Sequence, residues 1–310
     1  MSLVKLARRN RTDNAGSLGA VQRSIGYLQG GYKDATIHSR IQSFNTITQV
    51  GSIIYDTGYQ RNYRPGISGA FSGYFSINDT IAYNKFNYLT ASAALAPFTT
   101  LQHPSVSGCD FGIYSEAWLL TSTVASWDAV TPVSNWNKIN LSTDSLTNYG
   151  VISTGPLGTT RQGASTGIAS IFTNPNTVQL TSFKFADRSV TTIAGNAALG
   201  SGQQIPCGMS VDNNKVYFVG YIGKNVKITL SGSTILAQAV STSYTYNFGE
   251  SHSVTSSSAG YMMAGYADTT GRYGNTQHGL CQKIAFATES ITTLPDLVLP
   301  QSSGQMMQGF

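Results

Sequence analysis

Acidic and histidine side chains are the residues of this chain that could carry out acid–base or metal chemistry. Glycosyl transfer needs two carboxylates that face one substrate, and a metal site needs several converging His, Asp, Glu or Cys side chains. The chain has only 14 acids and 4 histidines in 310 residues, and the aspartates do not recur at one position of the repeat described below. Most of the aspartates stand beside Asn, Thr or Gly, where Asp forms turns, and no pair of histidines has metal-ligand spacing. We therefore predict no catalytic residue, no metal and no cofactor, and that the protein is not an enzyme.

The cysteines and the short motifs point the same way. Cys109, Cys207 and Cys281 are an odd number without a short spacing, which predicts reduced core residues instead of a disulfide framework or a zinc site. The sequence also has no phosphate-binding loop, nucleophile elbow or zinc motif.

Residues 55–64 are the best candidate for a binding surface. Tyrosine and arginine alternate there, and both are enriched at binding hot spots. Protein contact is the preferred interpretation, followed by sugar stacking and then by nucleic acid, while some of these tyrosines could instead pack between sheets. The candidate contact residues are Tyr55, Tyr59, Arg61, Tyr63 and Arg64.

Residues 1–24 form a basic arm outside the repeat. The net charge of +5 is concentrated there, since four bases precede the first acid, Asp13. A basic arm on a nearly neutral body indicates an acidic partner, and a solvated terminus is the other interpretation. Apolar anchors and bases together are the predicted partner-binding residues, namely Leu3, Val4, Lys5, Leu6, Arg8, Arg9 and Arg11.

Short strands in a repeat are the elements that would position these residues. A Gly-Tyr strand, as in residues 260–266, is followed by a Lys-Ile-Ala-Phe strand, and no window shows helical periodicity. The lysine of the second strand recurs at intervals of 43 to 56 residues, and residues 39–44 supply one further copy without it. The recurring lysines are Lys85, Lys138, Lys184, Lys227 and Lys283.

Six units of about 40–50 residues with four short strands each are typical of β-propeller blades. We predict an all-β fold, a six-bladed β-propeller over residues 25–310 preceded by the arm of residues 1–24. The lysines are expected on solvated strand faces, and small residues such as Gly26 and Gly260 are expected on the first strand, near the central channel. Small-residue linkers separate the units, and residues 300–307 resemble one more linker while the first unit has none before it. The C-terminal strand is therefore predicted to complete the first blade and close the ring.

Composition supports a folded β protein that enters no membrane. Charged residues are 11% and hydrophobic residues 41% of the chain, a composition that suits pleated, half-buried surfaces. No apolar run reaches the 18 or so residues of a membrane helix, and the N-terminus has no secretory pattern. We expect folding in a cytoplasm without membrane insertion.

The Gly-Tyr-apolar-apolar strand followed by the Lys-apolar-x-Phe strand resembles the kelch-like propeller proteins of tailed bacteriophages, cyanophages in particular, over residues 25–310. The resemblance implies a non-enzymatic virion protein of the tail or neck, assembled in the host cytoplasm. It would contact other virion proteins and copies of itself, and nucleic acid is not an expected partner. The alternative is a sugar-binding propeller, a tail-fibre adhesin or lectin that recognises a host-surface glycan.

Overall fold

The computed structural model describes the β-strands and part of the turns that join them. Every regular element in the described residues is a β-strand, which confirms the all-β prediction. Nowhere in this part of the chain is there an apolar helix of membrane-spanning length. The described residues are 25–33, 36–58, 66–68, 72–77, 82–99, 110–113, 116–122, 133–154, 157–162, 166–174, 177–184, 190–198, 207–209, 215–219, 225–231, 234–241, 252–256, 258–263, 281–295 and 305–308.

Antiparallel strands form groups, which we number from 1 to 6 along the chain and give from the centre outwards. Group 1 is β25 (Gln305–Gln308), β1 (Ile25–Gln29), β4 (Arg40–Asn45) and β5 (Val50–Asp56). Group 2 is β6 (Ser72–Ser76), β7 (Ala82–Asn87) and β8 (Ser92–Thr99). Group 3 is β9 (Asp110–Ile113), β10 (Glu116–Ser122), β11 (Val133–Asn140) and β12 (Ser145–Thr154).

The second half of the chain repeats this order. Group 4 is β13 (Leu157–Gln162), β14 (Thr166–Asn174), β15 (Thr177–Lys184) and β16 (Val190–Ala198). Group 5 is β17 (Cys207–Met209), β18 (Lys215–Val219), β19 (Asn225–Ser231) and β20 (Thr234–Ser241). Group 6 is β21 (His252–Thr255), β22 (Ala259–Met263), β23 (Cys281–Ala285) and β24 (Ile291–Leu294). A small hairpin, β2 (Tyr32–Lys33) with β3 (Thr36–Ile37), lies between β1 and β4.

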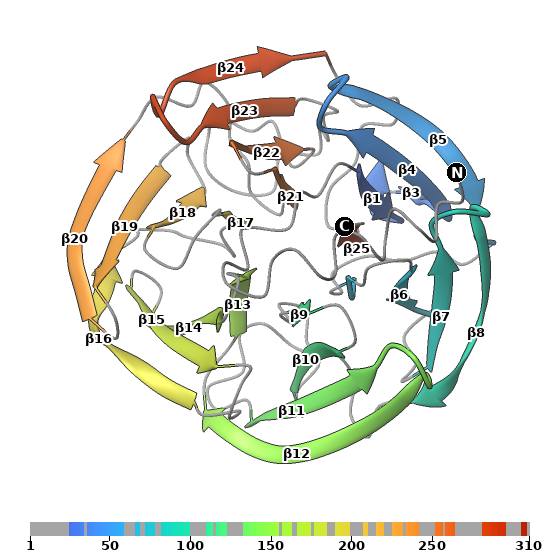
Figure 1. The fold of residues 1–310 in the computed structure, drawn as a ribbon, viewed down its shortest axis with the longest axis horizontal. Coiled ribbons are helices and arrows are strands. Elements are labelled where there is room, and N and C mark those ends of the chain that lie inside the picture. The colour runs from blue at the N-terminus through green and yellow to red at the C-terminus, as the bar shows by residue number, and fades with distance from the viewer. Residues whose placement is uncertain are drawn as a thin grey trace, which may run out of the picture.

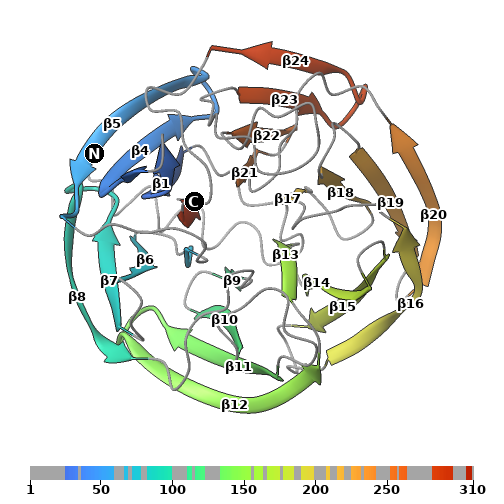
Figure 2. The same ribbon diagram turned by 180° about the vertical axis from the view of Figure 1, so that it is seen from behind.

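The groups lie around a common centre, with β5, β8, β12, β16, β20 and β24 on the circumference (Figures 1 and 2). Groups 4 and 5 are joined by a parallel bridge between Ala194 of β16 and Thr234 of β20, both on the circumference. This radial arrangement explains the burial pattern, since strands that face a neighbour on both sides become buried on both faces. All residues of β6 and β22 are buried, whereas every residue of β5 is exposed or half-buried.

The apolar core is divided among the spaces between groups. Tyr27 of β1 packs with Phe86 of β7 and stacks on Tyr88, with ring centroids 4.5 Å apart. Tyr74 of group 2 and Ile139 of group 3 share a second cluster. Other clusters join group 5 to group 6, and group 6 to group 1. Burial of apolar side chains against a neighbouring group thus stabilises the groups that these clusters join.

The Gly-Tyr strands take a different position from the one expected. Gly26 of β1 pairs with Phe44, and Gly260 of β22 pairs with Ile284, which makes these strands the second ones from the centre. Segments that were predicted to be linkers form the innermost positions: Cys207 lies in β17, and Ile67 bridges Tyr74. Short, small-residue segments fit at the centre because strands converge there.

The C-terminal strand lies where the sequence placed it. β25 pairs antiparallel with β1, matching Gly26 with Gln308 and Leu28 with Met306. Group 1 is therefore built from both ends of the described chain, and its innermost strand is the last one in the sequence.

Candidate interaction surface

Tyr55 is the one member of the predicted contact surface that the structure describes. Its ring lies 6.0 Å from that of Phe86, and its half-buried side chain joins the cluster between groups 1 and 2. The following Asp56 accepts hydrogen bonds from the Ser39 hydroxyl (2.6 Å) and the Gly58 amide (3.0 Å), which lower the pKa of its carboxyl. Tyr55 thus packs between groups 1 and 2, which was the alternative interpretation for the tyrosines of residues 55–64. The other four contact residues, Tyr59, Arg61, Tyr63 and Arg64, lie outside the described residues, as do the arm residues Leu3, Val4, Lys5, Leu6, Arg8, Arg9 and Arg11.

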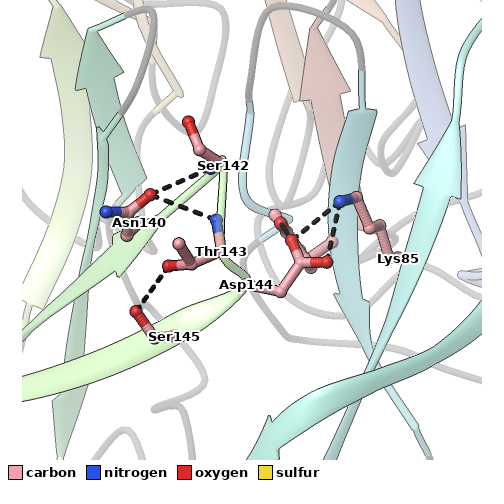
Figure 3. Close-up of polar contacts among 7 residues, drawn as sticks. Lys85, Asn140, Ser142, Thr143, Asp144 and Ser145 are labelled. Atoms are coloured by element: carbon pink, nitrogen blue, oxygen red, sulfur yellow. Dashed lines mark hydrogen bonds and ion pairs between the residues drawn. The ribbon is translucent and has the colours of Figure 1, made fainter.

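Lys85 and Asp144 join group 2 to group 3, which corrects the expectation that the recurring lysines lie on solvated faces. The Lys85 ammonium donates to both Asp144 carboxylate oxygens at 2.7 and 2.9 Å (Figure 3). The Tyr74 hydroxyl donates to Asp144 Oδ1 at 2.5 Å, and Lys85 Nζ lies 5.8 Å from the Tyr74 ring centroid. Burial and the hydrogen bond to Asp144 raise the pKa of Tyr74 well above its ordinary value, so the phenol stays a donor.

Lys227 and Glu289 repeat this arrangement between group 5 and group 6. The Lys227 ammonium donates to Glu289, and the Tyr217 hydroxyl reaches the same oxygen at 3.3 Å. The hydrogen bond from Lys227 lowers the pKa of Glu289, and the Tyr217 hydroxyl adds to the effect. We call each such set of tyrosine, lysine and acid a clasp.

Each clasp follows from strand register and turn conformation. Tyr74 faces Lys85 across β6 and β7, and Tyr217 faces Lys227 across β18 and β19, as direct cross-strand partners in neighbouring strands of one group. The acid comes from the turn before the outer strand of the next group, where Asp144 and Glu289 have positive φ values of 52° and 58°. Aspartate tolerates this left-handed conformation better than most residues do, whereas for glutamate it is uncommon.

Other groups carry variants of the clasp. Between group 6 and group 1, Tyr261 faces Lys283, but Gln49 takes the position of the acid, and the Tyr261 hydroxyl donates to the Thr46 carbonyl at 2.9 Å. In group 1, Ser43 faces Tyr27, and the next turn has Ala91 at the left-handed position. Between group 1 and group 2, both the lysine and the acid of the clasp are therefore absent.

Lys184 does not belong to this series. The backbone register pairs Gly167 with Phe183 and Ile168 with Ser182, so that Ser182 takes the position of Lys85. The spacing of lysines along the sequence was therefore misleading in group 4. A better signal is the acid six residues after a recurring lysine, as in Lys138 with Asp144 and Lys283 with Glu289.

Asparagine side chains shape the turns that lead to the outer strands. Asn87 Oδ1 accepts hydrogen bonds from the Leu89 and Thr90 amides at 2.9 and 3.2 Å, and Asn45 does the same for Ile47 and Thr48. Figure 3 shows the corresponding turn of group 3, where Asn140 holds the amides of Ser142 and Thr143. Such side-chain bonds to the following amides define the turn locally.

Large apolar side chains are exposed on two neighbouring outer strands and the turns before them. Leu89 is 76% exposed, and Ile47 and Leu95 are each 69% exposed. They lie in the turn at residues 46–49, in β5, in the turn at residues 88–91 and in β8, and β5 and β8 follow one another along the circumference (Figure 1). We call this surface the rim patch, and it consists of Ile47, Val50, Ile53, Leu89 and Leu95.

The outer strands carry almost no charge. Within β5, β8, β12, β16, β20 and β24 as the structure describes them, one residue, Asp56 at the end of β5, is charged. Outer edges of sheets commonly carry lysine or other charges that prevent pairing with another chain. The outer strands that the structure describes lack charges of this kind apart from Asp56, and Pro97 of β8 is the one edge-breaking residue among them.

The described residues bring no metal site together. Among them there is no group of three or more His, Cys, Asp or Glu side chains that could hold an ion. The three acids whose side chains are described, Asp56, Asp144 and Glu289, are engaged in the contacts given above. Cys281 is a buried, reduced cysteine, as predicted for it.

Comparison with known proteins identifies the fold without a family. No protein-family model and no curated protein matches the chain. The crystal structure of TolB from Acinetobacter baumannii, a β-propeller protein, is similar with a TM-score of 0.57 and 14% identity. The match covers 94% of this chain and 67% of the TolB chain. The comparison therefore supports a propeller-type, all-β fold.

Proposed function

We propose that this chain is a non-enzymatic structural protein of a tailed-phage virion, a tail or neck component that assembles with other virion proteins. The fold we propose is a closed six-bladed propeller in which groups 1 to 6 are the blades and β25 completes the first. A propeller of this kind supports many functions, so the proposal depends on its surface.

The uncharged circumference with its exposed apolar side chains is the observation that carries the proposal. Exposed apolar side chains on outer strands that lack charge are typical of protein contact sites. The outer strands offer backbone groups, hydroxyls and aliphatic side chains, and only Asp56 offers a charge. Such a surface is better suited to permanent contact with other subunits than to a monomer in solution.

The clasps support the same proposal from the interior. Tyr, Lys and acid are the residue types from which hydrolases build active sites, yet here Lys85 with Asp144 and Lys227 with Glu289 hold neighbouring groups together. The placement of the chain in a phage rests on the kelch-like pattern of the sequence.

Mass spectrometry of purified particles tests the proposal. We expect peptides of this chain in virions of the phage that encodes it, at a constant molar ratio to a tail protein, after washing with high salt. Absence of the chain from clean particles would overturn the virion role. Turnover of polysaccharide or peptidoglycan by the pure protein would overturn the non-enzymatic role, and specific binding on a glycan array would favour an adhesin.

A further inference from the structure

The rim patch occupies an edge at which a further strand can be added. In the part of the chain that the structure describes, β5 and β8 are terminal strands, each paired with an inner neighbour on one side. A terminal strand presents a row of backbone donors and acceptors that can pair with another strand. Along β8 from Ser92 to Thr99 no residue is charged, and along β5 only Asp56 is.

Outer strands of this chain already pair with one another elsewhere. The bridge between Ala194 of β16 and Thr234 of β20 joins the outermost strands of two groups into an eight-stranded sheet. A residue pair between outer strands of two groups can therefore form at the circumference. The rim patch adds to this capacity apolar side chains that would leave water on contact, at about 25 cal/mol for each Å² buried.

Charge indicates which partner fits the rim patch. The chain has a net charge of +5, so two copies repel unless the surfaces that meet carry few charges. A strongly charged partner would be matched by opposite charges at the contact, and the rim patch with its two strands offers one acid at the end of β5. An uncharged, apolar surface is complementary to itself, and contacts between identical surfaces form readily about a two-fold axis.

We propose that the rim patch on β5 and β8 is a homotypic contact, at which a second copy of this chain binds through the same patch about a two-fold axis. This inference deepens the proposed assembly function and rests on it, because it names one partner and one surface. Aliphatic contacts of Val50, Ile53 and Leu95 and backbone pairing at the two edges hold the copies together.

Sedimentation velocity of the pure protein over a range of concentrations tests this proposal. We expect a reversible monomer–dimer equilibrium for the natural chain. The double variant Val50→Lys with Leu95→Lys should weaken dimerisation at least tenfold, since it places two charges in each of two facing patches. Thr191→Lys is the matched control, because Thr191 is an exposed residue of the outer strand β16, across the ring from the patch (Figure 1). It should leave the dimer unchanged.

Each result decides the question. A natural chain that remains monomeric at high concentration overturns the proposal, and so does a dimer that both variants weaken equally. If the melting temperature of the double variant is much lower than that of the natural chain, its loss of dimerisation could come from misfolding. Hydrogen exchange of the natural chain is then the deciding measurement. Protection of β5 and β8 amides must then rise with protein concentration, and protection that is independent of concentration overturns the proposal. A monomeric chain found in particles would refute the rim contact alone, whereas a dimer absent from particles would refute the virion role alone.

Discussion

Gly26 of β1 lies against the side chain of Val254 of β21 so closely that there is no room for a Cβ atom at position 26. A Cβ built there would overlap Val254 Cγ2 and would lie 3.2 Å from Cγ1 and 3.3 Å from Cβ. The two residues belong to group 1 and group 6, the first and last along the chain. Glycine is needed at this position for close approach of the strands and not for a left-handed backbone.

Replacement Gly26→Ala should therefore destabilise the protein. An extra methyl group in a packed core forces shifts that cost about 1–3 kcal/mol, and β-branched Val254 has little freedom to turn away. Urea denaturation should show a lower midpoint with an unchanged slope. In a Val254→Ala background the same replacement should cost less than about 1 kcal/mol, because the obstructing methyl groups are absent. An equal cost in both backgrounds would show that the contact is not the reason.

The clasp of Lys227 and Glu289 should contribute a measurable coupling energy. In a double-mutant cycle with Lys227→Met and Glu289→Gln, we expect about 0.5–1 kcal/mol at low salt, since the pair is partly exposed. Raising the salt concentration should reduce it. The corresponding cycle with Lys85→Met and Asp144→Asn should give a larger value, because the Asp144 side chain is 22% exposed and that of Glu289 is 40% exposed. A coupling energy near zero in both cycles would show that the clasps do not stabilise the fold.

The lowered pKa of Glu289 predicts a loss of stability in acid. A carboxyl whose pKa is lower in the folded than in the unfolded state contributes full stability above its unfolded value, near 4.5. This contribution is lost as the pH falls through the folded-state pKa. The difference in unfolding free energy between the natural chain and Glu289→Gln should accordingly be largest near neutral pH and shrink below pH 4.5. A difference that grows on acidification would contradict the assigned direction.

A missing clasp can be completed between group 6 and group 1. Lys283 lies 6.0 Å from the Tyr261 ring centroid, as Lys85 does at 5.8 Å from Tyr74, but Gln49 replaces the acid. Gln49→Glu should raise the unfolding free energy by about 0.3–1 kcal/mol, measured by thermal or urea denaturation. The gain should vanish in a Lys283→Met background. If Gln49→Glu does not raise the unfolding free energy when Lys283 is present, the new carboxylate does not reach the Lys283 ammonium.

Deletion of residues 300–310 should lower the melting temperature by many degrees. It removes β25 and leaves the inner edge of β1 without its pairing partner. Calorimetry of the truncated chain checks this expectation. Melting like that of the full chain would mean that the pairing of β25 with β1 contributes little to stability.

The sequence predicted the strands well, because alternation and turn residues are local signals. Glycine and tyrosine at 26–27 and 260–261, each followed by a second strand, suffice to identify the repeat. The position of each strand within its group was harder to predict. Innermost β17 has three residues, too short to show a period. Pro206 before it and Gly208 within it suggested a linker.

The clasps could not be found from local patterns. Lys85 and Asp144 are 59 residues apart, and Lys227 and Glu289 are 62 apart. Each lysine therefore meets an acid from the next repeat unit, while the acid in a turn resembles an ordinary turn residue when read alone. The rim patch was missed for a related reason, since alternation in β5 and β8 does not reveal which strand of a group is outermost.

The pairing of the last strand with the first also sets the order of events during synthesis. β1 leaves the ribosome early, but its inner partner β25 consists of residues 305–308 of a 310-residue chain. At about 5–20 residues per second, the inner edge of β1 stays unpaired for many seconds. The face of group 1 that packs against group 6 stays uncovered for most of that time. Contacts between residues so distant in sequence also slow folding through the entropy of loop closure. Synthesis of β25 is therefore the event that permits completion of group 1, and a chain that stops before β25 keeps the inner edge of β1 unpaired.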